Sequence, residues 1–490
     1  MKDITSLTIR EINTIEEAMQ CIDQNSLGIA LIVDDDNKLL GVVTDGDIRR
    51  AILSSESLKT PISEVMHMKP VIAQQQATTT ELLKMMMEKN VRQIPIVTDN
   101  NIVVDIALLS ELKWVPLSSP DITYREVELI NKVLETPYLS IGPKIEEFEA
   151  KIARYTGTKF AVAVNSGTSA LHLCIRSLNI TDNDEVITTP FSFVASANCI
   201  LFERAKPVFV DIDKDTLCID VTRIEEKITE RTKAILPVHI FGHSCEMHKL
   251  IEIARKYHLA VIEDACEAIG GEYKGNKVGS FGDCGVFAFY PNKQITTAEG
   301  GMVVTNDEKI AALCRSLRNQ GRDETDSWLS HTRLGYNYRM SELSASLGTV
   351  QMDRIDEILE KRQKVADFYN KRLRNMPGII TPFVSKDVTM SWFVYVIRLD
   401  DTKLSMEDRD TVIRELRTRG INCRAYFPPI HLEPFYVEKF GYKKDSFPTT
   451  ERISNCTIAL PFHNNFEEEE VSYVGTALEK IIGSLTSDDS

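Results

Sequence analysis

One lysine of this chain lies where it could act as a nucleophile. Lys293 follows a short apolar segment, 285–289, that predicts a strand, and a second apolar segment, 302–305, comes after it. A lysine near the end of a strand, beside Phe289 and Tyr290, can lose its charge through desolvation and attack a carbonyl group as the free amine. The position alone would favour an ordinary loop lysine.

A carboxylate that precedes Lys293 favours the chemical interpretation. Asp264 ends the apolar segment 261–264, which predicts another strand. A lysine that bonds to an aldehyde and an aspartate that keeps a pyridine nitrogen protonated are the minimal apparatus for pyridoxal phosphate (PLP). Lys293 and Asp264 are therefore candidate catalytic residues, and PLP is the candidate cofactor.

A third motif could bind the phosphate of such a cofactor. Ser166, Gly167 and Thr168 open a predicted apolar helix directly after the predicted strand 160–164. A turn of this type at a helix N-terminus offers backbone N–H groups, hydroxyls and the positive end of the helix dipole to a phosphate. Serine and threonine are also ordinary N-cap residues, so the motif by itself is a weak signal.

The composition excludes several classes of protein. The 490 residues exceed one ordinary domain, and 43% hydrophobic and 26% charged residues are typical of a soluble globular chain. The net charge of −15, from 57 basic and 72 acidic residues, disfavours a nucleic-acid partner. We expect no membrane span and no signal peptide, because no apolar segment has the required length. Ten cysteines without a Cys-x-x-Cys pair indicate reduced thiols and a cytoplasmic protein.

Residues 1–115 form a predicted domain with two similar halves. The order helix, strand, strand occurs twice, in 15–22, 29–33 and 39–43 and again in 80–89, 93–97 and 102–107. A further helix is expected after each second strand, from Ile48 in the first half and from Ser110 in the second.

The segment GVVTDGDIR, residues 41–49, resembles the CBS domain family, and the two halves resemble a tandem pair of CBS modules. The resemblance implies that Thr44 and Asp47 would hold the ribose of a nucleotide, with an adenine nucleotide as the candidate ligand. Leu108 and Glu111 occupy the equivalent positions of the second half, so its ribose site is expected to be lost. A dimerising or packing module without a ligand is the alternative, because a fold alone does not specify function.

Prolines and serines at 116–120 predict a junction, and strands and helices alternate beyond it. This alternation indicates a largely parallel sheet flanked by helices. The predicted strands are 160–164, 185–189, 207–210, 234–238, 260–263, 286–289 and 302–305. We expect a large domain over 116–350 and a small α/β domain over 351–490. A long helix from Glu342 to about Asn375 would connect them, and a further element is expected at 422–426.

Motifs spread over residues 116–484 resemble the DegT/DnrJ/StrS group of sugar aminotransferases. They are, in order, PLSSP (116–120), GPKIEEFE (142–149), AVNSGTSAL (163–171), EDACEA (263–268), FYPNKQITTAEGG (289–301) and RLGYNYRM (333–340). Several spaced motifs in one order are more specific than any one of them. The resemblance implies an α/β fold of the aspartate aminotransferase type (fold type I). A large, mostly parallel sheet domain and a small C-terminal α/β domain would follow the CBS pair.

The resemblance also implies roles for single residues of the cofactor site. Lys293 would bind PLP covalently and later move a proton, and Asp264 would pair with the pyridinium nitrogen. Phe193 would stack on the ring, although a core aromatic is the alternative. The backbone of Gly167 and Thr168 would bind the phosphate.

Four further residues complete the implied site. Asn337 would reach a cofactor phosphate across a dimer interface, which implies a homodimer or a higher homo-oligomer. Glu267 would lie near the hydroxyl of the cofactor. His331 and Tyr290 are candidates for the sugar-nucleotide pocket, and a plain surface histidine is the alternative for His331.

Two positions depart from the family pattern. Ala288 stands where many members have a phosphate-binding serine, and Ala298 replaces a glycine, which puts the local backbone angle in doubt. A related branch of the family has histidine in place of the lysine and acts as a sugar dehydratase. Lys293 is present here, so transamination is the better interpretation.

Four residues at 239–248 could suggest a metal site. The spacing of His239, His243, Cys245 and His248 matches no strong zinc template, so we expect no bound metal and a structural role.

The hypothesis from the sequence is PLP-dependent transamination of a nucleotide-linked keto sugar. The FYPNK segment most resembles members that convert a 4-keto-6-deoxyhexose to a 4-amino sugar, with glutamate as donor, for surface polysaccharide or glycan biosynthesis. A 3-keto sugar or a free keto-cyclitol as substrate is one alternative. A chain whose main role is sensing adenine nucleotides through its CBS pair is the other.

Overall fold

The computed structural model describes residues 4–54, 56–109, 111–112, 114–323 and 330–487. The chain divides into two compact units, Met1–Val115 with Arg414–Asn422 and Pro116–Ile413 with Cys423–Ser490. The expected boundary at residue 350, inside the second unit, stays a prediction.

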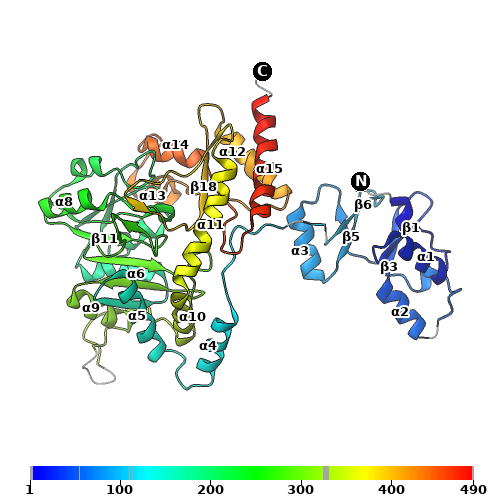
Figure 1. The fold of residues 1–490 in the computed structure, drawn as a ribbon, viewed down its shortest axis with the longest axis horizontal. Helices are drawn as coiled ribbons and strands as arrows, with labels where there is room; N and C mark the ends of the chain where they lie inside the picture. The colour runs from blue at the N-terminus through cyan, green and yellow to red at the C-terminus, as the bar shows by residue number, and fades with distance from the viewer. Residues whose placement is uncertain (1–3, 55, 110, 113, 324–329, 488–490) are drawn as a thin grey trace. The chain divides into compact units, whose positions relative to one another are not determined.

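The first unit has two halves with the same topology, and each half contains a three-stranded sheet (Figure 1). Its elements are η1 (Ile4–Leu7), β1 (Thr8–Ile9), α1 (Ile15–Asn25), β2 (Ile29–Val33), β3 (Leu39–Thr44), α2 (Asp45–Leu53), η2 (Ile62–Glu64), β4 (Ala73–Gln74), α3 (Thr79–Lys89), β5 (Gln93–Val97) and β6 (Val103–Leu108). In each half the first strand is parallel and the third antiparallel to the middle strand. Ile29 pairs with Thr44, and Gln93 pairs with Leu108, so Leu108 is the counterpart of Thr44.

The two halves share backbone hydrogen bonds and a core. The N–H of Leu39 donates to the oxygen of Asn101 at 2.9 Å, and the N–H of Val103 donates to the oxygen of Asn37 at 3.1 Å. Buried aliphatic residues of β2, β3, β5 and β6 form one cluster between the halves. Burial of this apolar surface stabilises the pair as one body.

The helix expected from Ser110 is not found in the described part of this segment. Ser110 itself lies outside the described residues, and the N–H groups of Glu111 and Leu112 both donate to the oxygen of Leu108, which makes a turn. Pro116 follows soon after and cannot continue a helix.

The second unit is built on a seven-stranded sheet with the order β7-β15-β14-β11-β10-β8-β9. These strands are β7 (Phe160–Val164), β8 (Glu185–Thr188), β9 (Lys206–Phe209), β10 (Thr232–Ile235), β11 (Ala260–Asp264), β14 (Cys284–Ala288) and β15 (Gly301–Thr305). Only β15 is antiparallel to its neighbours in this sheet, so the expected mostly parallel sheet is confirmed. Two small sheets contain β12 (Glu272–Tyr273), β13 (Asn276–Lys277), β16 (Ile379–Ile380), β17 (Val388–Thr389), β18 (Tyr395–Leu399) and β19 (Thr457–Leu460).

Helices cover the seven-stranded sheet because its strands are apolar on both sides (Figure 1). The α-helices are α4 (Tyr124–Leu134), α5 (Pro143–Thr156), α6 (Gly167–Ser177), α7 (Ala195–Phe202), α8 (Met247–Tyr257), α9 (Glu308–Arg318), α10 (Glu342–Asp353), α11 (Ile355–Leu373), α13 (Pro434–Phe440), α14 (Pro448–Cys456) and α15 (Glu468–Ser487), with α12 (Met406–Thr418) shared between the units. Short 3-10 helices are η3 (Val221–Arg223), η4 (Glu225–Lys227), η5 (Ile240–Gly242) and η6 (Ile430–Leu432). On β7, Ala161 and Ala163 pack with Phe148 of α5 in the central core.

The single long helix expected over 342–375 is two helices, and Arg354 lies at the break (Figure 1). Its buried guanidinium donates to Asp121 and Glu126, both at 2.9 Å. These contacts tie the break to the segment that leads into α4. The element expected at 422–426 is neither a helix nor a strand, since Arg424 makes only an isolated bridge with Ala459.

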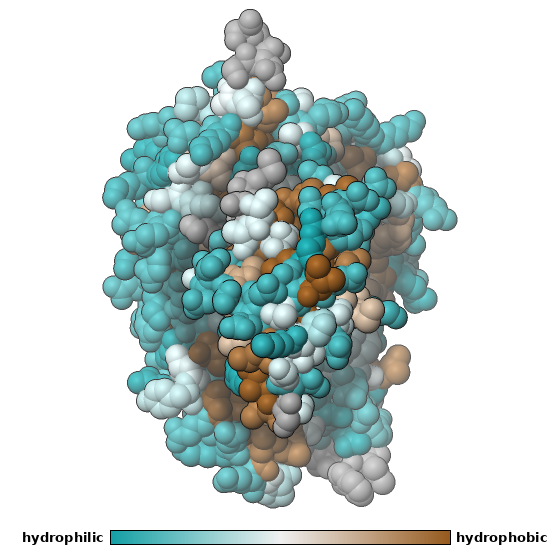
Figure 2. All heavy atoms as spheres, turned by 90° about the vertical axis from the view of Figure 1, so that its right-hand side faces the viewer, coloured by the Kyte–Doolittle hydropathy of each residue, from teal (hydrophilic) through white to brown (hydrophobic). Residues whose placement is uncertain are grey.

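Figure 2 shows a mostly hydrophilic face on which hydrophobic residues gather in a few places. Among the residues that the structure describes, no helix combines the length and the apolar character needed to cross a membrane.

Candidate active site

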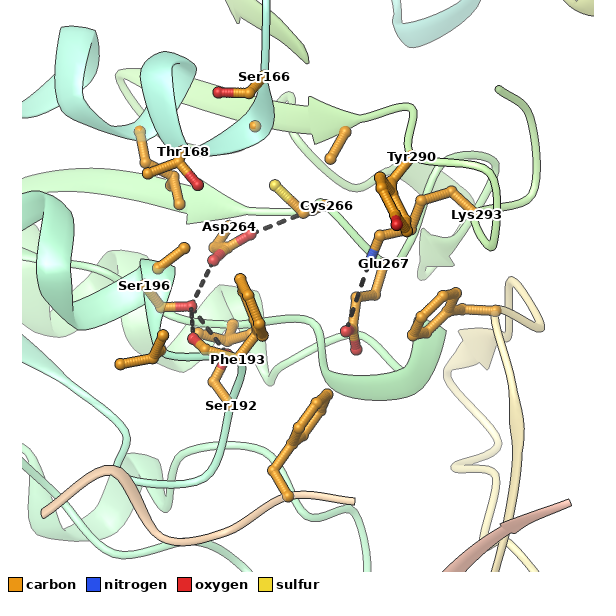
Figure 3. A pocket seen from close by; sticks show the side chains of 18 of the residues that line it. Ser166, Thr168, Ser192, Phe193, Ser196, Asp264, Cys266, Glu267, Tyr290 and Lys293 are labelled. Carbon is orange, nitrogen blue, oxygen red and sulfur yellow. Dashed lines mark hydrogen bonds and ion pairs between the residues drawn. The ribbon is translucent and has the colours of Figure 1, made fainter. Parts of the chain in front are cut away.

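A cavity of about 650 Å³ lies in the second unit, at the carboxyl ends of β7, β8, β11 and β14 (Figure 3). Ligands of open α/β sheets bind at this edge, because the loops that follow the strands meet there. Seven residues that the sequence proposed for the site line the cavity: Gly167, Thr168, Phe193, Asp264, Glu267, Tyr290 and Lys293.

Lys293 and Glu267 form a close pair inside this cavity. The Nζ atom of Lys293 lies 3.5 Å from Oε1 of Glu267 and 3.9 Å from the centre of the Phe393 ring. Glu267 also accepts the N–H of Phe241 at 2.9 Å. Burial raises the pKa of Glu267, and the nearby Lys293 partly offsets this. The pair can therefore exchange a proton more readily than an exposed pair could.

Asp264 ends β11 and points into the cavity from the sheet (Figure 3). Its Oδ2 atom accepts the hydroxyl of Ser196 at 2.6 Å, and its Oδ1 atom accepts the N–H of Cys266 at 3.2 Å. Ser196 is hydrogen-bonded in turn to Ser192 at 2.8 Å. These bonds fix the orientation of a carboxylate that could pair with a protonated ring nitrogen.

The N-terminus of α6 forms a cradle that suits a phosphate. Ser166 is the N-cap, and its hydroxyl oxygen accepts the N–H of Ser169 at 3.1 Å. A Cβ atom on Gly167 would lie 2.7 Å from the Cβ of Ala288 and 3.1 Å from the Sγ of Cys266, so no larger residue fits without a shift. The first backbone N–H groups of α6 thus remain close to the cavity, where an anion would meet the positive end of the helix.

The two residues that depart from the family pattern, Ala288 and Ala298, change the local structure of the site. Ala288 lies in this cradle and offers no hydroxyl to a phosphate. Ala298 adopts φ 65°, the left-handed region, which costs an alanine about 1 kcal/mol. The hydroxyl of Thr296 accepts the N–H of Ala298 at 2.9 Å, which supports this strained turn.

Two aromatic side chains border the cavity. Phe193 is 59% exposed and Tyr290 is 53% exposed, although both line the cavity (Figure 3). Large aromatic rings left open at a cavity provide flat apolar surface on which a ring or a sugar can stack.

Asn337 and His331 are not among the lining residues of this cavity. Both side chains are exposed, and Nδ1 of His331 bonds with the oxygen of Gln320 at 2.8 Å. A second cavity of about 150 Å³ lies beside the same part of the chain. Four arginines line it: Arg315, Arg318, Arg322 and Arg339.

Thr44 and Asp47 belong to the first unit, where they form a capping box at the start of α2. The hydroxyl of Thr44 donates to Oδ2 of Asp47 at 2.7 Å, and Arg50 binds the other carboxylate oxygen. Burial would raise the pKa of Asp47, but these hydrogen bonds outweigh it and lower the pKa. The two residues therefore lie side by side at a helix N-terminus, as a ribose site would require.

The candidate metal residues have other partners. His239 bonds with Glu263 at 3.1 Å and with the N–H of Cys245 at 3.1 Å, and His243 bonds with the oxygen of Ser244 at 2.8 Å. Over the residues with described positions, no three or more His, Cys, Asp or Glu side chains gather as metal ligands would.

The sequence did not indicate several residues of the site. Ser192 and Ser196 support Asp264, yet the sequence around them indicates a role only for Phe193. Phe393 reaches Lys293 from a loop before β18 that lies far away in the chain. Ser196 lies near the start of the helix that follows β8, which is only a weak indication of a role in the site. No pattern in the sequence indicates a role for Phe393.

Family models match both units of the chain. Residues 120–479 match the DegT/DnrJ/EryC1/StrS aminotransferase family, and residues 1–54 and 62–113 match the CBS domain. The chain therefore belongs to the DegT/DnrJ/EryC1/StrS aminotransferase family and carries an N-terminal pair of CBS domains. Its class is that of the PLP-dependent sugar aminotransferases of fold type I, as the sequence predicted.

The sequences of known relatives align with most of the second unit. The chain is 38% identical to GDP-perosamine synthase of Caulobacter vibrioides over 376 residues, which are 76% of this chain and 100% of that protein. It is 36% identical to the spore coat polysaccharide biosynthesis protein SpsC of Bacillus subtilis over 378 residues, 75% of this chain and 97% of that one.

Solved structures of sugar aminotransferases show the same fold. PseC of Helicobacter pylori, an aminotransferase of pseudoaminic acid biosynthesis, has a TM-score of 0.72 and 30% identity over 76% of this chain and all of its own. The PLP form of the putative sugar aminotransferase Spr1654 of Streptococcus pneumoniae has a TM-score of 0.73 and 30% identity, with the same coverage.

Replacing Glu267 by glutamine should change the pH dependence of stability of the cofactor-free protein. Because the pKa of Glu267 is raised above its ordinary value of 4.5, the folded protein binds this proton more tightly than the unfolded chain. The wild type therefore loses stability as pH rises from 4.5 through the folded pKa, and Glu267→Gln removes this loss. The variant's Tm relative to wild type should rise over this window, measured by scanning calorimetry.

The matched control is Glu299→Gln, an exposed glutamate that borders the same cavity. This substitution controls for the loss of a negative charge at the cavity. A Tm difference for Glu267→Gln that stays constant or falls with pH would contradict the assignment.

Proposed function

We propose that this chain binds PLP through Lys293 and transfers an amino group to a nucleotide-linked keto sugar, with glutamate as the donor. The main support for this proposal is that Lys293, Asp264 and the N-terminus of α6 at Gly167 line the same cavity. An amine for an aldehyde, a carboxylate for a ring nitrogen and a helix terminus for a phosphate are the three contacts that PLP requires. The described residues therefore fit this cofactor.

Each residue around the bound cofactor would have its own role. Bound PLP supplies an electron sink for the negative charge that develops on the reacting carbon. Asp264 would hold a proton at the ring nitrogen, and Phe193 would keep the ring in place. The amine of Lys293 would move a proton at the reacting carbon, and Glu267 at 3.5 Å can take or return it. In the whole reaction glutamate becomes 2-oxoglutarate and the ketone becomes an amine, so no other oxidant or reductant is needed.

Two observations support a nucleotide-linked sugar as the substrate. Two relatives at 38% and 37% identity are GDP-perosamine synthases. The cavity beside Asn337 is lined by four arginines and two carboxylates, Glu146 and Asp323, so positive charge is in excess there, which suits a diphosphate. A 4-keto-6-deoxyhexose, made into a 4-amino sugar for surface polysaccharide or glycan, is our proposed substrate, with His331 and Tyr290 as candidate contacts. Ten free cysteines support a cytoplasmic location.

We further propose that the working form is a homodimer or a higher homo-oligomer, in which Asn337 reaches the phosphate of the partner's cofactor. Asn337 is exposed and lies outside the lining of the cavity in its own chain, which supports a role in a second subunit. An amide N–H₂ is a suitable donor to a phosphate oxygen.

The two half-reactions test the proposed reaction. Glutamate should convert the cofactor to its amine form and remove the visible absorbance band of the lysine-bound form. Adding a GDP- or UDP-linked 4-keto-6-deoxy sugar should restore the band with one of the two nucleotides. Lys293→Ala should lack the band from the start, whereas Lys277→Ala, outside the cavity lining, should keep it.

The outcomes separate the alternatives. Restoration only by a 3-keto sugar or by a free keto-cyclitol would replace the proposed substrate and keep the cofactor. A band that survives in Lys293→Ala would contradict the role of Lys293.

For the first unit we propose an adenine nucleotide at Thr44 and Asp47, supported by their adjacent hydroxyl and carboxylate at the N-terminus of α2. Calorimetric titration of the full chain with AMP and ATP should show binding, and Thr44→Val should weaken it about tenfold because a ribose contact is lost. Thr78→Val removes a similar capping box, at the start of α3 in the other half, and should leave the affinity unchanged. No heat with either nucleotide would leave a packing module as the function of this unit.

A further inference from the structure

Two tyrosines flank Asn337 and stack on each other. The rings of Tyr336 and Tyr338 have centroids 4.9 Å apart and planes at 9°. Side chains of successive residues in an extended segment point to opposite sides, so the stacked pair directs Asn337 the other way. Asn337 is accordingly exposed, whereas both tyrosines are half-buried.

The largely buried carboxylate of Glu203 is hydrogen-bonded to this tyrosine pair, directly to Tyr336 and through His172 to Tyr338. Oε1 of Glu203, directly after α7, accepts the hydroxyl of Tyr336 at 3.0 Å and bonds with Nε2 of His172 at 2.9 Å. Its other oxygen accepts Arg176 at 3.1 Å. The side chain of Glu203 is 12% exposed, so these three donors replace most of its water.

His172 connects the same carboxylate to the second tyrosine. Burial lowers the pKa of His172, which keeps the imidazole neutral. A carboxylate only accepts, so Nε2–H donates to Glu203 and Nδ1 accepts the hydroxyl of Tyr338 at 3.1 Å. One glutamate thereby fixes the polar ends of Tyr336 and Tyr338.

The backbone of the segment is fixed as well. The N–H of Tyr338 donates to the oxygen of Arg318 at 3.0 Å, and the N–H of Asn165 donates to the oxygen of Tyr338 at 2.9 Å. With the main chain and both flanking side chains held, the backbone of Asn337 is fixed, and its side chain leaves the segment on the side opposite the two tyrosines.

We propose that Glu203, acting through His172 and the two tyrosines, positions Asn337 for the cofactor phosphate of the partner subunit. This inference rests on the proposed function, which assigns Asn337 to that phosphate. Glu203 is a positioning residue, since it touches neither cofactor nor substrate, and its effect falls on the active site of the other subunit.

The first test is the substitution Glu203→Gln. Glutamine has one acceptor oxygen and two N–H donors, so it cannot accept all three donors of the network. The dimer should persist in sedimentation, but its affinity for PLP, titrated by the visible band, should fall about tenfold because a hydrogen bond to a charged phosphate is weakened. Unchanged affinity would overturn the proposal.

Glu185→Gln is the matched control. Glu185 is also buried in the second unit and is held by Thr229, Lys206 and Arg231. It begins β8, at the end of the sheet opposite the cavity, so its substitution should leave the PLP affinity at the wild-type value.

Mixed dimers test the action across the interface. In a dimer of one Glu203→Gln chain and one Lys293→Ala chain, the remaining lysine lies on the Glu203→Gln chain and receives Asn337 from a chain with an intact network. We expect this site to bind PLP with wild-type affinity. An affinity as weak as that of the Glu203→Gln homodimer would overturn the proposal, because the defect would then lie in the same chain.

Tyr336→Phe provides a second variant if Glu203→Gln does not fold. It keeps the stacked ring and removes only the hydroxyl that binds Glu203. A smaller loss of PLP affinity, again restored in the mixed dimer, is the expected result, and wild-type affinity in the Tyr336→Phe homodimer would overturn the proposal. A wild-type protein without the lysine-bound band would instead overturn the proposed cofactor, and the inference with it.

Discussion

The arrangement of the site depends on one constraint, the parallel sheet of the second unit. Because β7, β11 and β14 run in the same direction, the residues that follow them meet at one edge. Gly167, Asp264 and Lys293 are far apart in the chain, and this edge brings them into one cavity. The antiparallel strand β15 returns the chain through the sheet beside β14, so the loop that carries Lys293 begins and ends at this edge.

Much of this arrangement could be predicted from the sequence. Apolar segments separated by polar turns predicted the strands of the seven-stranded sheet, and ordered motifs predicted the family that the comparisons confirm. The break at Arg354 cannot be seen in the sequence, because the apolar pattern continues across it and the partners of Arg354, Asp121 and Glu126, are distant in the chain. Phe393 and Ser196 were also missed, since contacts between distant segments leave no periodic pattern in the chain.

The two units suggest a division of roles. The second unit contains the cavity, whereas the first unit repeats one CBS half and has Leu108 where the other half has Thr44. In the second unit, Asn337 is turned outward by Glu203, His172 and two tyrosines, so one subunit would complete the phosphate site of the other. Dimer formation and cofactor binding would then be coupled by mass action.

The most direct test of the central claim is to locate the covalent bond between the cofactor and the chain. The protein is incubated with PLP, reduced with borohydride, digested and analysed by mass spectrometry. Our account predicts one pyridoxyl group, on the peptide that contains Lys293, and none on the peptide with Lys277. A cofactor group on another lysine, or on no lysine, would contradict it.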